Sequence, residues 1–209
     1  MENSIYSDAS LLGFEIVKLG HEALRKTSLE TKDIHFKSSQ LMNFIGHMER
    51  TLSATEGVGL AAPQVSVNYQ LFITSIPQSC EERYILCKSS PFKVLINPSY
   101  EVTDSEVLGG IEGCLSIPGF VGRVLRPKKI TAKAFDENGQ EFVEELVGWN
   151  ARIFLHEYDH LYGKMYIDKL SSNSKGNLEL YESSFWKTLE DKKRQGNEYK
   201  WLENRGLKP

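Results

Sequence analysis

The sequence predicts an α+β fold, in which antiparallel or mixed β-sheets surround one buried central helix. An N-terminal helix and a C-terminal helical extension complete the expected architecture. Three observations predict this class. Apolar residues recur at helical spacing early in the chain and again late. Several short runs between those segments alternate in the manner of half-buried strands. An Asn-Gly turn joins two of these runs, which is typical of an antiparallel hairpin.

Three helices are expected. The first covers residues 40–53, where the apolar positions fall on one face and indicate core packing: Leu41, Phe44, Ile45, Met48 and Leu52. The second begins near Asn150 and ends at Gly163, a residue that commonly terminates helices. The third is mostly polar and covers residues 178–194.

Five strands are expected from period-two alternation and from flanking turn residues. They are residues 70–76, 93–98, 100–107, 129–135 and 141–147. Pro98 is expected to end the second strand, because proline cannot donate a ladder hydrogen bond. Residues 109–119 are rich in glycine and predict a tight turn around Cys114. Residues 77–92 read as a polar excursion between strands.

The composition of the 209 residues, 40% hydrophobic and 25% charged, suits one soluble domain with a sizeable core. We expect this domain at residues 1–171, with 1–13 as a flexible arm and 172–209 as an extension that is not an independent domain. The net charge of -3 argues against a nucleic-acid site or an anionic membrane surface. An acidic N-terminus and an odd count of three cysteines favour the cytoplasm.

The late helix carries the pattern His156-Glu157-Tyr158-Asp159-His160. Histidines four positions apart lie on one helix face, where two imidazoles can hold one metal ion. The carboxylate of Glu157 lies one step round the helix, within reach of a metal-bound water. The simpler alternative is a helix with two surface histidines. That alternative is weak in a chain with five histidines, two of which flank a glutamate in this way.

Two histidines leave a tetrahedral catalytic ion in need of one more protein ligand. No acidic residue follows His160 at a suitable distance, whereas Cys114 stands beside Gly113 in the expected turn. Cys80 and Cys87 are better explained as buried structural cysteines. A site of one cysteine and two histidines suits zinc, iron(II), nickel or cobalt, and the residue types do not choose among them.

Three separated stretches together resemble the motifs of the peptide deformylase family. They are GVGLAAPQ at residues 57–64, EGCLS at 112–116 and HEYDH at 156–160, in the order in which the family has them. The resemblance covers roughly residues 14–171. It implies removal of the formyl group from N-formylmethionine of new polypeptides, with formate and a free N-terminal amine as products. It also implies iron(II) as the working metal, with zinc, nickel or cobalt in purified protein.

The resemblance assigns roles by position. The implied metal ligands are Cys114, His156 and His160, and the implied catalytic groups are Glu157 as general acid and base, the Gln64 side chain and the Leu115 backbone N–H as oxyanion donors. Substrate is expected along Gly57, Val58 and Gly59, where a loop can pair with an extended peptide. An apolar pocket for methionine is expected among Val58, Leu115, Trp149 and Ile153.

Two further expectations concern the late helix. Arg126 lies where the family pattern has a basic residue, so we expect it to pair with Asp159 and to hold the helix against the sheet. Leu155 departs from the family pattern, which has glutamine immediately before the first histidine. The ligands are untouched, so activity is expected to survive this change.

The expected partners are N-formylmethionyl nascent peptides, and we expect a monomer. Basic residues in the extension, Lys187, Lys192, Lys193 and Arg194, raise the hypothesis of ribosome contact. Two other functions compete with deformylation: a metallopeptidase of the His-Glu-x-x-His type, and a non-catalytic, ribosome-associated metal-binding homologue. The non-catalytic alternative is disfavoured, because a structural metal site requires neither Glu157 nor Gln64.

Overall fold

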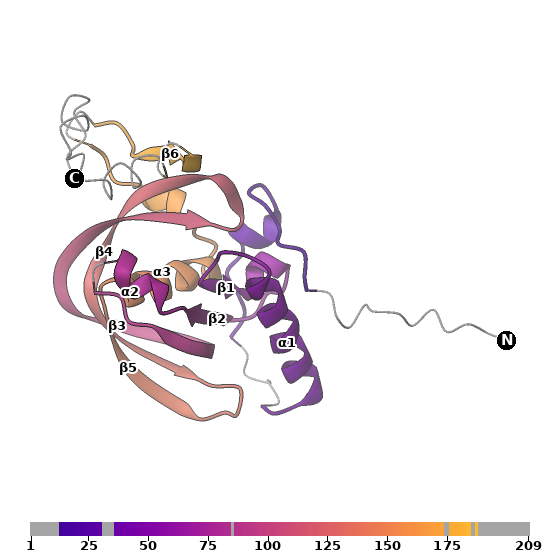
Figure 1. Cartoon of the computed structure of the whole chain (residues 1–209). Coiled ribbons are helices and arrows are strands. Elements are labelled where there is room, and N and C mark those ends of the chain that lie inside the picture. Colours follow the sequence, from indigo (N-terminus) through magenta and orange to yellow (C-terminus); the bar gives the residue numbers. More distant parts are fainter. Residues whose placement is uncertain (1–12, 31–35, 85, 174–175, 185–186, 188–209) are drawn as a thin grey trace.

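A curved antiparallel sheet encloses the central helix α3 (Trp149–Leu161) in the computed structural model (Figure 1). The structure describes residues 13–30, 36–84, 86–173, 176–184 and 187. The strands follow the order β1-β2-β3-β4-β5, and β6 pairs with β4. Their bounds are β1 Gly59–Ala61, β2 Leu71–Ile76, β3 Ser90–Cys114, β4 Ile117–Phe135, β5 Glu141–Val147 and β6 Leu180–Glu182. The predicted α+β class and its central helix are confirmed.

The remaining elements are short or peripheral, apart from α1. Their bounds are α1 Ser39–Ser53, α2 Ser79–Arg83, and the 3₁₀ turns η1 Glu22–Arg25, η2 Ala62–Val65 and η3 Tyr166–Lys169. The side chain of Ser38 caps the N-terminus of α1 by accepting a hydrogen bond from the Leu41 N–H. The apolar stripe of α1 packs against β1, β2 and β3, as its periodicity predicts. No helix in the described part of the chain is long and apolar enough to cross a bilayer.

The strands β3 and β4 form one long curved ribbon, which corrects two predictions. Pro98 does not end a strand, because the register shifts between Ile96 and Ser99 and Asn97 takes a positive φ of 47°. A bulge of this kind accommodates a proline inside a ladder. The glycine-rich stretch continues β3 as far as Cys114, so the turn there is much shorter than expected. At Gly110, a Cβ atom would lie 2.7 Å from the Arg152 guanidinium, so glycine provides space here.

The hairpin between β4 and β5 is confirmed. Asp136 donates its backbone N–H to the Gln140 carbonyl at 2.9 Å, and Gly139 takes the positive φ of 79° that the turn requires. The seven paired positions from Lys129↔Val147 to Phe135↔Glu141 keep an unbroken register. The second strand of this hairpin leads through Gly148 into α3.

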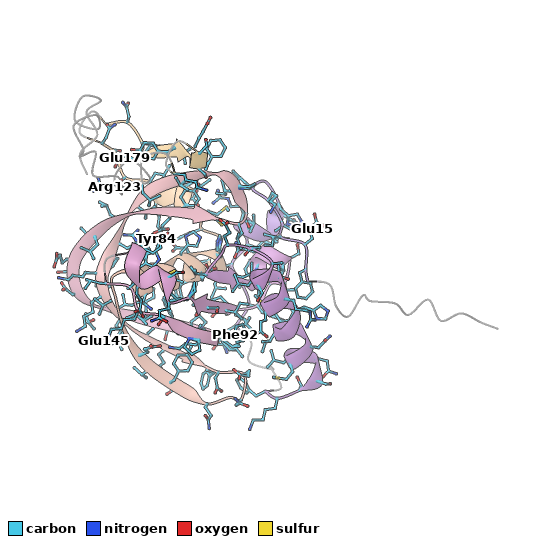
Figure 2. All side chains as sticks on the ribbon, in the orientation of Figure 1. Glu15, Tyr84, Phe92, Arg123, Glu145 and Glu179 are labelled. Carbon is cyan, nitrogen blue, oxygen red and sulfur yellow. The ribbon has the colours of Figure 1, made fainter. Side chains whose placement is uncertain are left out.

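The predicted helix at residues 178–194 is wrong at its beginning. Residues Leu180–Glu182 form β6, which pairs with Phe120, Val121 and Gly122 of β4. Glu179 is buried, and its carboxylate lies 3.4 Å from Arg123. Both residues are labelled in Figure 2. Helical backbone begins at Ser183. Of the arm expected at residues 1–13, only Gly13 lies within the described residues. The basic residues at 192–194 also lie outside them, and Lys187 is exposed.

Candidate metal centre and active site

The helix α3 brings its two histidines together inside the sheet. Gly148, with φ of 60°, turns the chain from β5 into the helix, and most side chains of α3 are buried. The rings of His156 and His160 lie with their centroids 5.1 Å apart and nearly perpendicular. His160 has no exposed surface, which is unusual for a histidine without a polar role.

Cys114 completes a cluster with these histidines. It ends β3, and its Sγ lies 3.3 Å from His160 Nε2. The donor atoms of Cys114, His156 and His160 all lie within 4.8 Å of one another, and they form the one such group in the described part of the chain. Bonds of about 2.0–2.3 Å to a tetrahedral ion place donor atoms roughly 3.3–3.8 Å apart. The three residues therefore fit a metal ion after small side-chain movements.

The protonation state of His160 also suits a metal ligand. Burial and the neighbouring His156 lower the pKa of His160 well below its usual value, so its imidazole is neutral at pH 7. His160 Nδ1 is buried and has no hydrogen-bond partner among the described residues. A neutral imidazole is the form of histidine that binds a metal ion.

Glu112 holds the other histidine. Its Oε2 lies 2.9 Å from His156 Nδ1. Arg126 donates to both carboxylate oxygens, from Nε to Oε1 at 2.9 Å and from Nη2 to Oε2 at 2.8 Å. Burial opposes ionisation, but the hydrogen bonds from Arg126 and His156 hold the pKa of Glu112 well below its usual range. An ionised Glu112 accepts a hydrogen bond from the Nδ1–H of His156, which leaves Nε2 of His156 free to bind a metal. Sequence reasoning missed this role, although Glu112 stands within the EGCLS stretch.

Glu157 lies deep in the site. It is buried, and its Oε2 has no hydrogen-bond partner among the described residues. Burial raises the pKa of Glu157 to about 7. A Cβ atom on Gly59 would collide with this carboxylate, so glycine at that position lets β1 approach the side chain closely.

Gln64 reaches the cluster from η2 with its amide oriented. Its Oε1 accepts the Ala61 N–H at 2.8 Å, so Nε2 faces the other way. That Nε2 lies 3.3 Å from Ser116 Oγ and 3.5 Å from Cys114 Sγ. Gln64 is 2% exposed, so its amide group is buried beside the Cys114 thiol. Leu115 follows Cys114 directly, and its carbonyl accepts a bond from Lys18 Nζ at 3.0 Å.

The expected substrate loop is partly a strand. Gly59 starts β1, which stands at the end of the strand order and, among the described residues, pairs only with β2. The Val58 carbonyl, just before β1, accepts the Ser75 N–H at 2.9 Å. An edge strand has a second side on which an extended peptide can add. Gly57 precedes this edge and packs against Leu115 and Leu52.

The expected methionine pocket is only partly assembled as predicted. Val58, Trp149 and Ile153 belong to one apolar cluster, which also contains Ile76, Cys80, Cys87 and Tyr84. The ring of Tyr84, labelled in Figure 2, stacks on Trp149 with centroids 3.9 Å apart. Leu115 packs instead in the cluster of α1, because the turn after Cys114 directs its side chain toward Gly57.

The other cysteines are buried and free of disulfides, as expected. Burial and the neighbouring Cys80 raise the pKa of Cys87 to about 11. Thiols that stay protonated at pH 7 are poor nucleophiles and poor ligands. Cys87 is therefore a poor candidate ligand, and both cysteines pack in the apolar cluster with Ile76 and Ile153.

The contacts of α3 confirm one expectation and show where Leu155 lies. Arg126 Nη1 donates to Asp159 Oδ2 at 2.5 Å, so the predicted pair is confirmed, and Lys169 adds a second partner at 2.8 Å. Leu155 is buried in the apolar cluster with Ile130 and Phe72. The leucine thus extends the core beneath the helix and leaves the three candidate ligands in place.

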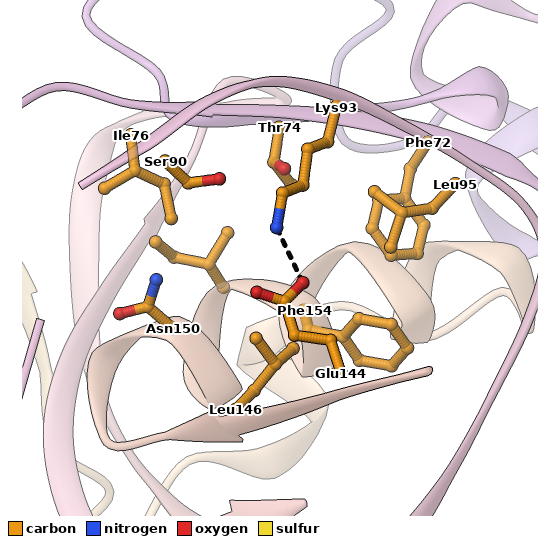
Figure 3. Close-up of a pocket in the computed structure, with 11 residues that line it drawn as sticks. Phe72, Thr74, Ile76, Ser90, Lys93, Leu95, Glu144, Leu146, Asn150 and Phe154 are labelled. Carbon is orange, nitrogen blue, oxygen red and sulfur yellow. Dashed lines mark hydrogen bonds and ion pairs between the residues drawn. The ribbon is translucent and has the colours of Figure 1, made fainter. Parts of the chain in front are cut away.

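A separate hollow lies between β2, β3, β5 and the start of α3 (Figure 3). Lys93 reaches across it to Glu144 at 2.6 Å, the ion pair drawn as a dashed line. Its volume of about 30 Å³ is enough for a water molecule and too small for a peptide. This hollow holds none of the candidate ligands, so it is not the active site.

The chain matches known proteins over most of its length. The family model described as polypeptide deformylase matches residues 14–176. Peptide deformylase 3 of Streptomyces avermitilis is 40% identical over 166 residues, which cover 76% of this chain and 74% of that protein. The peptide deformylase of Leptospira biflexa is 37% identical over 158 residues, covering 76% of this chain and 88% of that one.

Solved structures give the same result. A class I type b peptide deformylase from Acinetobacter baumannii with Met-Ala-Ser bound has a TM-score of 0.70 at 29% identity, covering 76% of this chain and 99% of that one. The enzyme from Thermotoga maritima has a TM-score of 0.67 at 33% identity, covering 76% and 98%. The chain therefore belongs to the peptide deformylase family, enzymes that remove the formyl group from the N-terminal methionine of newly made polypeptides.

Proposed function

We propose that this chain deformylates N-formylmethionyl peptides with iron(II) held by Cys114, His156 and His160. One observation carries the proposal: Gln64 Nε2 lies 3.5 Å from Cys114 Sγ, and the buried carboxylate of Glu157, from a different element, interacts electrostatically with His156. A structural metal site would need neither group. A divalent ion in such a site polarises a carbonyl oxygen and lowers the pKa of a water molecule.

Glu157 is proposed as the group that moves the proton. With a pKa near 7, its carboxyl group exchanges a proton readily at neutral pH. It takes the proton from the attacking water and later gives it to the leaving amine. The absence of a competing partner on Oε2 among the described residues leaves that oxygen ready for this exchange.

Gln64 and the Leu115 backbone N–H are proposed as donors to the developing oxyanion. The bond from Ala61 N–H to Gln64 Oε1 supports this role, because it aims the amide nitrogen at the site before substrate arrives. An uncharged amide stabilises negative charge without competing for the metal.

The substrate is proposed to lie along Gly57, Val58 and Gly59 as an added strand. Main-chain pairing of this kind is indifferent to sequence, which suits an enzyme that accepts many nascent chains. The methionine side chain is assigned to the apolar cluster of Val58, Trp149 and Ile153. By analogy with the relative that was solved with Met-Ala-Ser bound, the product is a tripeptide-like free amine.

We propose further that the enzyme works in the cytoplasm as a monomer, with residues 1–171 as the catalytic domain and 172–209 as an extension. Ribosome contact through the extension stays a hypothesis, since residues 192–194 lie outside the described residues.

The activity is tested by formate release from formyl-Met-Ala-Ser with anaerobically prepared, iron(II)-loaded protein. We expect stoichiometric formate and free Met-Ala-Ser. The unformylated peptide serves as the control and should stay intact. Absence of formate would refute the proposal, and cleavage of internal peptide bonds would support the metallopeptidase alternative.

Replacing Gln64 with leucine is expected to lower kcat by about 10²–10³-fold, or roughly 2.7–4 kcal/mol of barrier, because one oxyanion donor is lost. Metal content, measured by elemental analysis, should stay at the wild-type level. Gln70→Leu is the matched control, since Gln70 bonds the Ser28 carbonyl away from the cluster. A Gln64→Leu enzyme with wild-type kcat would remove Gln64 from the mechanism.

A further inference from the structure

Arg152 is a buried arginine that the proposed chemistry does not use. Its side chain is 4% exposed. Nη1 donates to Glu112 Oε1 at 2.8 Å and to the Val124 carbonyl at 2.9 Å, and Nη2 donates to the Leu108 carbonyl at 2.6 Å. Removing a guanidinium from water costs several kcal/mol, so a buried arginine must find a full set of acceptors. The acceptors of these hydrogen bonds lie on both β3 and β4.

Glu112 links Arg152 to the metal cluster. Its Oε1 accepts from Arg152 Nη1 and Arg126 Nε, and its Oε2 accepts from Arg126 Nη2 and contacts His156 Nδ1. Each carboxylate oxygen therefore has two partners, and the carboxylate has a single orientation. Arg152 and His156 are four positions apart, so one turn of α3 contacts both oxygens of Glu112.

This arrangement connects the strand that carries the thiol to the helix that carries the imidazoles. Glu112 lies two residues before Cys114 in β3. The hydrogen bond from Arg152 of α3 to Glu112 therefore fixes the position of the helix along the strand. Gly110 supports this reading, because a Cβ atom there would meet the Arg152 guanidinium at 2.7 Å.

We propose that Arg152 is a positioning residue, which holds Cys114 and His156 in ligand geometry before the metal binds. The inference rests on the proposed function, since it assumes that these residues ligate the metal. Arg126 also connects Glu112 to α3, but its backbone lies in β4 and it reaches the helix only through the Asp159 side chain. Arg152 makes this connection from the helix itself.

The test is Arg152→Met, which keeps the length of the side chain and removes its donors. We expect cobalt(II) to bind 10–100-fold more weakly, roughly the loss typical when a group that orients a metal ligand is removed. Affinity is measured by chelator competition without substrate, and the cobalt–thiolate absorption band should shift. Arg152→Lys, which keeps the charge but loses the two-armed fork, should fall between Arg152→Met and wild type.

Arg123→Met is the matched control. Arg123 covers Gly109 as Arg152 covers Gly110, and it pairs with Glu179 rather than Glu112. Its cobalt affinity and spectrum should equal those of wild type. If Arg152→Met has a lower melting temperature but wild-type cobalt affinity and spectrum, Arg152 is merely structural and the inference fails. If Arg152→Met does not fold, wild-type affinity in Arg152→Lys overturns the inference in the same way.

These experiments distinguish failure of the proposed function from failure of the role proposed for Arg152. A wild-type protein that binds cobalt but releases no formate refutes the proposed function whatever Arg152 does. A wild-type protein that releases formate, with unchanged cobalt affinity in both Arg152 variants, refutes only the role of Arg152.

Discussion

Glu157→Gln is expected to lower kcat for deformylation by about 10²–10⁴-fold, because glutamine cannot carry the proton between water and the leaving amine. The substitution keeps the shape of a buried side chain that packs against Gly59, so KM and metal content should change little. Steady-state formate release gives kcat and KM, and elemental analysis gives the metal content. Glu49→Gln, on the exposed face of α1, is the control and should have wild-type kcat.

The same variant has a second readout in the metal-free protein. The pKa of Glu157 rises from 4.5 to about 7 on folding because of burial, so the folded state holds its proton more tightly than the unfolded state. The contribution of this group to stability is therefore present below pH 4.5 and is lost as the pH rises to about 7. In Glu157→Gln this loss should be absent, as urea unfolding at several pH values would measure. Identical pH dependence in both proteins, or wild-type kcat, would contradict the assignment.

Arg126→Ala is expected to destabilise the fold by about 3–5 kcal/mol, because removal of one partner leaves buried charges without compensation. Glu112 and Asp159 both lose a guanidinium, and their side chains are only 3% and 9% exposed. Arg152 and Lys169 remain as partial substitutes. Urea unfolding of the metal-free protein gives the free energy, and metal content should fall because Glu112 no longer orients His156.

Lys133→Ala is the control for this experiment. Lys133 pairs with Glu141 at 2.8 Å, with side chains 51% and 44% exposed. Exposed pairs of this kind contribute at most about 1 kcal/mol, because water and salt screen them. Equal stability of Arg126→Ala and Lys133→Ala, with unchanged metal content, would show that the pair does not hold α3 against the sheet.

Local patterns determined what could be predicted from the sequence. The spacing of His156 and His160 places both on one helix face whatever the rest of the fold does, since 3.6 residues make a turn. The stripe of α1 and the Asn-Gly hairpin are likewise short-range signals, and both are confirmed. Cys114 came from elimination and from resemblance to the family, and the structure brings its Sγ to 3.3 Å from His160 Nε2.

Tertiary structure decided whatever depends on residues far apart in the chain. Pro98 lies within β3 because a bulge next to it keeps the ladder with β4, and residues 180–182 are a strand because β4 offers them an edge. Glu112 and His156 are 44 positions apart, and Arg152 lies 40 from Glu112, so no local period relates them. Their contact exists because the curved ribbon folds over α3. The sequence by itself determined which side chains can bind a metal, and the tertiary structure decided which charges hold them there, because cross-element contacts leave no short-range pattern.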